Sequence, residues 1–189
     1  WETMIVPEDR SLVRQAVEAH LRGETERLAG EFRLMRPDGR IHWMQGKGSA
    51  MRDSQGRATR LYGAISDVTE RKQSDLLLQN ILENSVSGIL AMRAVRNADE
   101  QIVDFAYTLA NPAAAEVVGH PIDQIVGQRM HRLMPGHFAN GLFDRYVQVV
   151  EQQQPTVFEA HYGPQGLDPS WFHIVAFPLQ DGLSVTFTD

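Results

Sequence analysis

The sequence contains no cysteine, which excludes disulfide bonds, thiolate metal sites, cysteine nucleophiles and cofactors joined to the chain through sulfur. It has no run of about 18 apolar residues, so it predicts no transmembrane helix. Its first residues lack the basic start, apolar middle and small-residue cleavage site of a secretion signal. A glycine-rich phosphate loop and a HExxH pair are also missing, and none of the seven histidines precedes an acidic residue as a phosphoacceptor histidine would. We therefore expect neither an enzyme active site nor a metal site in these residues.

Basic patches with interleaved aromatic residues are lacking too, so nucleic acid is not an expected partner. The charge is uneven, with a net charge of +1 over residues 1–75 and −7 over residues 76–189, against −6 for the whole chain. The hydrophobic content of 42% and the charged content of 22% are ordinary for a globular protein. A chain of 189 residues has room for one or two domains.

A long internal repeat is the most informative feature that the sequence does contain. Three pairs of identical residues share a separation of 128 positions: Pro7 and Pro135, Glu31 and Glu159, and Trp43 and Trp171. Each copy has the pattern of a helix that begins at a proline, followed by three strands and an aspartate. Asp67 and Asp189 end the two copies 122 positions apart, which predicts a last hairpin longer by six residues in the first copy.

The periodicity of apolar residues and the turn signals between them place the elements of the repeat. In the first copy they predict a helix over residues 7–24 and strands over 31–35, 41–51 and 58–67. In the second copy they predict a helix over residues 135–154 and strands over 156–162, 171–179 and 183–189.

The second copy also has a front half that the first copy lacks. Alternating apolar residues predict strands over residues 88–96 and 102–110. Asn111 and Pro112 then open a helix that Gly119 ends.

Four stretches of this sequence resemble the PAS family: WETMIVPEDRSLVRQAV, EFRLMRPDGRIHWM, GAISDVTERK and LANPAAAEVVGHPIDQIVGQRMHRLMPG. The resemblance covers almost the whole chain. It implies an α+β fold, with a five-stranded antiparallel sheet and short helices on one face. It further implies that residues 1–68 are only the C-terminal half of a first PAS domain, residues 69–84 a linker helix, and residues 85–189 a nearly complete second domain. We expect the chain to be a piece of a longer protein, with an output domain beyond Asp189.

The linker helix follows the D-x-T motif of the first copy. Asp67 is positioned to cap it, with Glu70 completing an acidic variant of the capping box. Leu78 and Leu82 fit the seam of a coiled coil, but Arg71, one heptad earlier, is polar. Pairing in a dimer and packing on the second domain therefore both remain open for this helix. The resemblance makes four residues candidates for signal relay: Asp67, Thr69, Glu70 and Asp189.

PAS-like folds often hold a small molecule between the sheet and the long helix, so the resemblance also implies a ligand site in the second domain. The candidates are Asn111, Met134, His137, Phe143, Tyr146, Phe158 and His173. The sequence requires no cofactor, although haem, held by His131 or His137, and a non-covalent flavin are compatible with the family.

Two functions follow from the resemblance. The first is a sensory input module of a bacterial signalling protein, which binds a small molecule or partner and relays a shift through the D-x-T motif and linker helix to a diguanylate cyclase or histidine kinase. The second is a ligand-free dimerisation scaffold. A space completely filled by Phe143, Tyr146 and Phe158 would favour the scaffold. In either case we expect these residues to form a cytoplasmic homodimer that does not contact a membrane. A membrane anchor upstream in the parent protein is compatible with this expectation.

Overall fold

The computed structural model describes residues 2–162 and 170–189. The chain divides into two compact units, residues 1–78 and 79–189. The division falls inside the helix α2 (Thr69–Asn84), which has the bounds that the sequence predicts.

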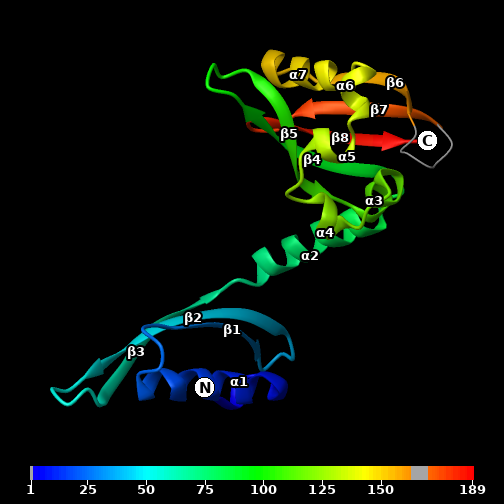
Figure 1. Ribbon diagram of the computed structural model, residues 1–189. Helices are drawn as coiled ribbons and strands as arrows, with labels where there is room; N and C mark the ends of the chain where they lie inside the picture. Colours follow the sequence, from blue (N-terminus) through cyan, green and yellow to red (C-terminus); the bar gives the residue numbers. More distant parts are fainter. Residues whose placement is uncertain (1, 163–169) are drawn as a thin grey trace. The chain divides into compact units, whose positions relative to one another are not determined.

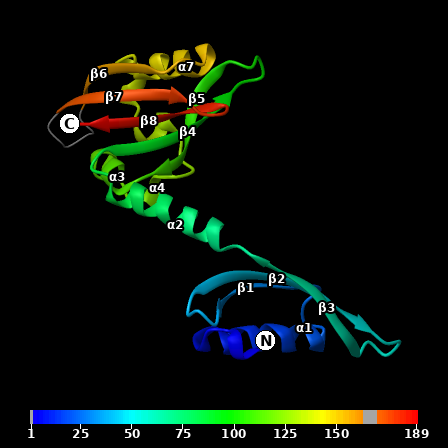
Figure 2. The same cartoon turned by 180° about the vertical axis from the view of Figure 1, so that it is seen from behind.

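The first unit contains η1 (Glu2–Met4), α1 (Pro7–Arg22), β1 (Leu28–Met35), β2 (Ile41–Arg52) and β3 (Ala58–Asp67). The strands form an antiparallel sheet in the order β1-β2-β3, and α1 lies along one face of it (Figures 1 and 2). Gly39 and Gly56 lie in the two predicted turns at φ values of 81° and 78°. Glycine adopts this left-handed conformation without a steric penalty, so the turn residues fix the two hairpins.

Both ends of α1 follow from its sequence. Pro7 lies in the first turn, and Gly23 ends the helix with a φ of 85°. The carboxylate of Asp9 accepts a hydrogen bond from the backbone N–H of Arg33 on β1, at 2.8 Å, and pairs with the Arg33 guanidinium at 2.6 Å. Hydrogen bonding to Arg33 lowers the pKa of Asp9. These contacts attach the first turn of α1 to β1.

Among the described residues, the second unit contains the end of α2 and ten further elements. They are β4 (Gly88–Arg96), β5 (Ile102–Ala110), α3 (Pro112–Val118), α4 (Ile122–Ile125), α5 (Met130–Leu133), α6 (Gly136–Ala139), α7 (Leu142–Gln152), β6 (Thr156–Tyr162), β7 (Ser170–Pro178) and β8 (Gly182–Thr188). The sheet is antiparallel and five-stranded, in the order β5-β4-β8-β7-β6. Helix α3 packs on β4, α5 on β5, and α7 on β7 and β8 (Figure 1). The expected α+β fold is confirmed.

The core of the second unit lies between this sheet and its helices. Phe105 and Tyr107 of β5, Ile125 of α4, Met130 of α5 and Leu183 of β8 are almost completely buried. Burying side chains of this size removes a large apolar area from water, which is the main source of the unit's stability.

The predicted helix over residues 135–154 is wrong as one element, because the structure divides it into α6 and α7. Gly141, at a φ of 81°, breaks the helical path between them. The side chain of Asn140 accepts a hydrogen bond from the backbone N–H of Leu142 at 3.1 Å and satisfies a donor at the start of α7. Continuous apolar periodicity concealed this local break.

The strand pairings confirm the internal repeat. Glu31 of β1 pairs with Gln45 of β2, and Glu159 of β6, 128 positions later, pairs with His173 of β7. The β2–β3 and β7–β8 pairs also share one register: Gln45 pairs with Ser66, as His173 pairs with Thr188. Equivalent positions in the two sheets can therefore be compared residue by residue.

Candidate ligand groove and relay helix

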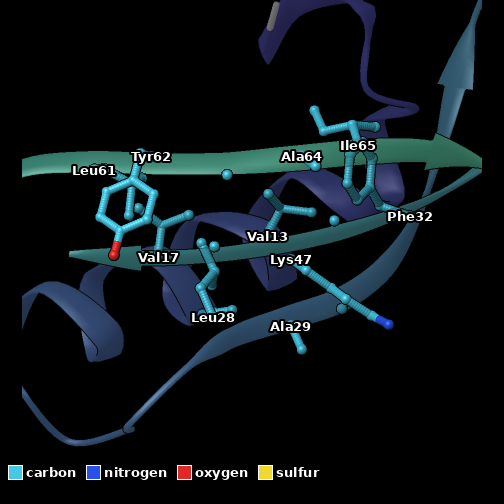
Figure 3. Close-up of a pocket in the computed structure, with 15 residues that line it drawn as sticks. Val13, Val17, Leu28, Ala29, Phe32, Lys47, Leu61, Tyr62, Ala64 and Ile65 are labelled. Atoms are coloured by element: carbon cyan, nitrogen blue, oxygen red, sulfur yellow. The ribbon is translucent and has the colours of Figure 1, made fainter.

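A groove with a volume of about 330 Å³ lies between α1 and the sheet of the first unit. Its walls are mostly apolar: Val13, Ala16 and Val17 of α1, Leu28 and Phe32 of β1, and Leu61 and Ile65 of β3. Figure 3 shows Val13, Val17 and Leu28 between the helix and the strands, with Lys47 extending away from them. The volume lies within the range of small-molecule sites, and the lining favours an apolar ligand.

Four glycines line this groove and leave space in it. Gly30 pairs with Gly46, and Gly48 pairs with Gly63, so two adjacent positions across the sheet carry no side chains. All four glycines line the groove. Sequence reasoning missed this site, although the alternating glycines of GKG at residues 46–48 were a signal of a hollow sheet face.

In the second unit, side chains occupy the corresponding space between the sheet and its helices. The equivalents of the four glycines are Phe158, Ile174, Ala176 and Val185, as the strand pairings show. The remaining cavity has a volume of about 40 Å³, close to that of one water molecule. This volume is too small for haem or flavin.

Three of the predicted ligand residues meet at this small cavity. Met134, His137 and Tyr146 all line it and are all buried. The ring centroids of His137 and Tyr146 are 6.4 Å apart. Burial raises the pKa of the Tyr146 phenol above its ordinary value. The fold thus brings these three candidates together, and a ligand role for them stays a prediction.

The other aromatic candidates and His173 lie elsewhere. Phe143 stacks on Phe138 with ring centroids 4.4 Å apart. Phe158 lies beneath the guanidinium of Arg145, which is 4.7 Å from the ring centroid. His173 is exposed, because it alternates along β7 with buried neighbours and so lies on the outer face of the sheet. None of the three lines the small cavity.

Asn111 has a different role from the one expected of it. This buried side chain caps α3 by accepting a hydrogen bond from the N–H of Ala114 at 3.0 Å, and it also accepts one from the N–H of Ile89 at 2.8 Å. Its amide group donates to the carbonyls of Leu82, at 3.2 Å, and Ser87, at 2.9 Å. Asn111 thus joins the last turn of α2 to β4 and α3.

Burial lowers the pKa of His137 to about 4, from an ordinary value of 6.5. The folded second unit therefore prefers neutral His137, and its stability is complete above about pH 6.5. We expect the free energy of unfolding to fall by about 3 kcal/mol as the pH drops from 6.5 to 4, because the unfolded chain then binds a proton that the folded unit excludes. Chemical denaturation across this range measures the loss.

The variant His137→Gln removes the titrating group, so its loss over the same pH range is expected to be smaller than that of the wild type. His131→Gln is the matched control, because His131 is exposed and lies on the neighbouring helix α5. Equal pH profiles for wild type and His137→Gln would contradict the assignment.

The D-x-T motif ties the start of α2 to the sheet of the first unit. The carboxylate of Asp67 accepts a hydrogen bond from the N–H of Thr69 at 2.9 Å and contacts Nδ1 of His42 at 2.7 Å. The Thr69 hydroxyl accepts a hydrogen bond from the backbone N–H of Trp43 at 2.9 Å, and the Trp43 carbonyl accepts one from Val68 at 2.8 Å. The motif therefore determines where α2 leaves β2 and β3.

A cluster of charged residues extends this attachment along α2. The carboxylate of Glu31 on β1 pairs with Lys72 at 2.5 Å and with Arg71 at 2.8 Å. The ammonium group of Lys72 also lies 5.3 Å from the centre of the Trp43 ring, and Arg33 is 5.7 Å from it. Sequence reasoning missed Glu31 and Trp43 as contacts of the helix, because only the fold brings them to it.

The two remaining relay candidates make fewer contacts. Within the described part of the chain, the exposed side chain of Glu70 makes no hydrogen bond or ion pair, so it does not complete the expected capping box. Asp189 accepts a hydrogen bond from the hydroxyl of Ser170 at 3.1 Å.

The hydroxyl and backbone N–H of Thr69, followed by His42, hold the pKa of Asp67 well below its usual range. A carboxylate with a depressed pKa stabilises the fold above the pKa of the unfolded chain, near 4, and this contribution is lost as the pH falls further. We expect the contacts at the start of α2 to loosen below about pH 4. The NMR signals of Thr69 and His42 report this change.

The variant Asp67→Asn should weaken the contacts at the start of α2 at pH 7. It should also reduce the change in the Thr69 NMR signal as the pH falls below about 4. Asp53→Asn serves as the control, because Asp53 also has a lowered pKa but binds Arg57 in a turn remote from α2 in sequence. An unchanged acid response of the Thr69 signal in Asp67→Asn would contradict this account.

No group of His, Asp or Glu side chains in residues 2–162 and 170–189 is arranged to hold a metal ion. In that same part of the chain, no helix has both the length and the apolar character needed to cross a bilayer.

Comparison with known proteins gives two successive matches to family models, both described as PAS fold. One covers residues 1–65 and the other residues 103–189. No curated protein matches the chain.

Several solved structures are similar to parts of the chain. A sensory box histidine kinase/response regulator from Burkholderia thailandensis E264 is 35% identical, with a TM-score of 0.38 over 41% of this chain and 58% of the other. A domain of a sensory box sensor histidine kinase/response regulator from Geobacter sulfurreducens is 16% identical, with a TM-score of 0.47 over 65% and 99%. The N-terminal domain of a diguanylate cyclase with PAS/PAC sensor from Marinobacter aquaeolei is 25% identical, with a TM-score of 0.34 over 38% and 65%. This chain therefore spans less than two thirds of the first and third of these.

Proposed function

Since the chain belongs to the PAS family, we propose that it is a sensory input region in which an apolar small molecule binds the groove of the first unit and shifts α2. PAS domains are sensory modules rather than enzymes, and the proposed role requires no catalytic residue. The output that α2 would control is a diguanylate cyclase or a histidine kinase elsewhere in the parent protein.

The continuity of β3 with the groove and with α2 is the observation that supports this function. Leu61, Gly63 and Ile65 of β3 line the groove. Two residues after Ile65 the same strand ends at Asp67, whose carboxylate holds Thr69 at the start of α2. A ligand that displaces β3 therefore acts directly on the attachment of the helix.

The far end of α2 is also attached. Asn111 holds the Leu82 carbonyl within the second unit, and Val117 and Val118 of the helix that it caps line the small cavity. A rotation or shift of α2 thus changes the hydrogen bonds of Asn111. We propose that α2 passes the state of the first unit to the second by population shift between two arrangements of these contacts.

A substitution that fills the groove tests the ligand site. A Cβ atom at Gly30 would meet no atom within 4 Å, so Gly30→Leu adds bulk to the groove without a backbone clash. We expect the variant to bind the neutral fluorescent probe N-phenyl-1-naphthylamine at least about 10-fold more weakly than the wild type, because the side chain occupies the probe's volume. A fluorescence titration measures both affinities.

The matched control is Ser49→Leu, which adds the same side chain to the same sheet at a position that does not line the groove. It should bind the probe as the wild type does. Equal binding by wild type and Gly30→Leu, or no binding by the wild type at millimolar probe, would refute a ligand role for this groove.

The exposed apolar side chains of α2 favour a second function, the dimerisation scaffold. Leu77, Leu78 and Ile81 are 55–61% exposed, which is unusual for a solvated helix. The nearly filled cavity of the second unit also agrees with a ligand-free role for that unit. Sedimentation velocity of the wild type and of Leu78→Glu distinguishes the two functions, because only a scaffold that pairs through α2 dissociates in the variant.

A further inference from the structure

The two edges of the five-stranded sheet differ in how they are covered. At the β5 edge, the register with β4 shifts at two places, and the backbone of Gly127 and Gln128 exchanges two hydrogen bonds with Tyr107. At the other edge, beside α7 in Figures 1 and 2, β6 pairs with β7 over seven residues without a register shift. Among the described residues, no other backbone hydrogen bond reaches β6. Its outer edge therefore offers N–H and C=O groups to another extended chain.

A polar groove lies beside this free edge. It has a volume of about 510 Å³ and lies between α7 and the start of β6. Arg145, Gln148 and Gln152 line it from α7, where their spacing places them on one side of the helix. Gln154 and Thr156 line it from the turn and the strand. Because primary amides both donate and accept hydrogen bonds, this lining suits the polar groups of a peptide better than an apolar molecule.

Two charges without ion-pair partners lie on opposite faces of β6. The guanidinium of Arg145 is 4.7 Å from the centre of the ring of Phe158, which faces the core. The next residue, Glu159, is exposed on the outer face. Neither charge forms an ion pair within the described part of the chain. A strand paired with β6 would place one side chain about 5 Å from Phe158, near Arg145, and the adjacent one beside Glu159.

We propose that β6 binds an extended segment of another protein as a sixth, antiparallel strand, in which a basic, an acidic and an apolar residue follow one another. The basic residue pairs with Glu159, the acidic residue with Arg145, and the apolar residue packs on Val157, which is 59% exposed. This surface shares no residue with the groove of the first unit or with α2. Its test is therefore independent of the proposed ligand and relay.

An NMR titration of the full chain with a short peptide provides the test. The peptide acetyl-Thr-Val-Lys-Glu-Val-Thr-amide has the required order of residues, and its Glu lies opposite Phe158 when its Lys lies opposite Glu159. We expect it to shift the amide signals of β6 in a saturable manner at millimolar concentration. A control peptide with Gln in place of Glu should bind about 5-fold more weakly, because it cannot pair with the guanidinium.

Substitution of the guanidinium identifies the partner of the acidic residue. Arg145→Gln should weaken binding of the Glu peptide about 5-fold and remove the difference between the two peptides. Arg93→Gln is the matched control, because Arg93 is an exposed arginine on β4 that does not line the groove. It should leave both affinities unchanged. Equal affinities of the two peptides for the wild type would overturn the proposal, as would no shift of any β6 amide.

Methylation of the peptide backbone distinguishes strand pairing from attraction of charges alone. Only every second N–H of an added strand points to β6, so N-methyl groups on one alternate set of residues should abolish binding, whereas those on the other set should retain it. Binding by both methylated peptides, or by neither, would contradict strand addition. Concentration-dependent β6 signals in the chain without peptide would also contradict the proposal, because a second copy would then occupy the edge.

Discussion

Replacement of Asn111 by alanine is expected to lower the free energy of unfolding of the second unit by about 3 kcal/mol. The variant loses the cap of α3, which contributes about 1 kcal/mol. It also leaves the N–H of Ile89 and the carbonyls of Leu82 and Ser87 without the side chain that binds them. Each buried polar group left unsatisfied costs about 1–3 kcal/mol. Thermal and urea denaturation measure the loss.

Asn140→Ala is the matched control, because Asn140 also satisfies a helix start but is exposed and makes one hydrogen bond of this kind. Its expected loss is about 1 kcal/mol or less. Asn111→Asp distinguishes the accepting from the donating hydrogen bonds of this side chain. A carboxylate still accepts hydrogen bonds from the N–H groups of Ala114 and Ile89, but it cannot donate one to the carbonyl of Leu82. We expect it to retain the fold and to speed amide exchange in the last turn of α2. A loss for Asn111→Ala no larger than that for Asn140→Ala would contradict the role assigned here.

The second large effect is expected at Gly182, the first residue of β8. A Cβ atom at this position would lie 2.0 Å from the Met92 carbonyl oxygen and 2.9 Å from the Cα atom of Arg93. Both obstacles are backbone atoms of β4, which cannot turn aside as a side chain can. We expect Gly182→Ala to destabilise the second unit by about 3 kcal/mol or more, because the β4–β8 pairing must open to admit the methyl group. Its unfolding midpoint in urea measures the effect.

Gly30→Ala provides a comparison, because it places the same methyl group in a strand where no atom lies within 4 Å. Its stability should stay within about 0.5 kcal/mol of the wild type. Comparable losses for the two variants would show that the effect comes from strand propensity and not from the contact with β4.

The sequence predicted most strands closely, because alternation and turn residues are local signals. The strands over 58–67, 88–96, 102–110 and 156–162 have the predicted bounds, as does the linker helix. The resemblance to the PAS family supplied the sheet, which local patterns alone do not determine. The break at Gly141 was missed because apolar residues continue with helical spacing across it.

The candidate sites were harder to predict, because they depend on which residues face each other. Alternation along β7 could have excluded His173 from the interior, since Phe172 and Ile174 on either side of it are buried. The hydrogen bonds of Asn111 could not be anticipated, because they join segments that are 22 to 29 residues apart. The glycine pairs that line the groove can be identified only once the registers of β1 with β2 and of β2 with β3 are known.

Amide hydrogen exchange across residues 69–84, with and without N-phenyl-1-naphthylamine, tests the central claim most directly. If occupancy of the groove acts on α2 through β3, saturation with the probe should change the exchange rates of the first turns of α2 by several-fold in the wild type. No such change is expected in Gly30→Leu. A probe that binds the wild type in the groove yet leaves every amide of α2 unchanged would contradict the relay.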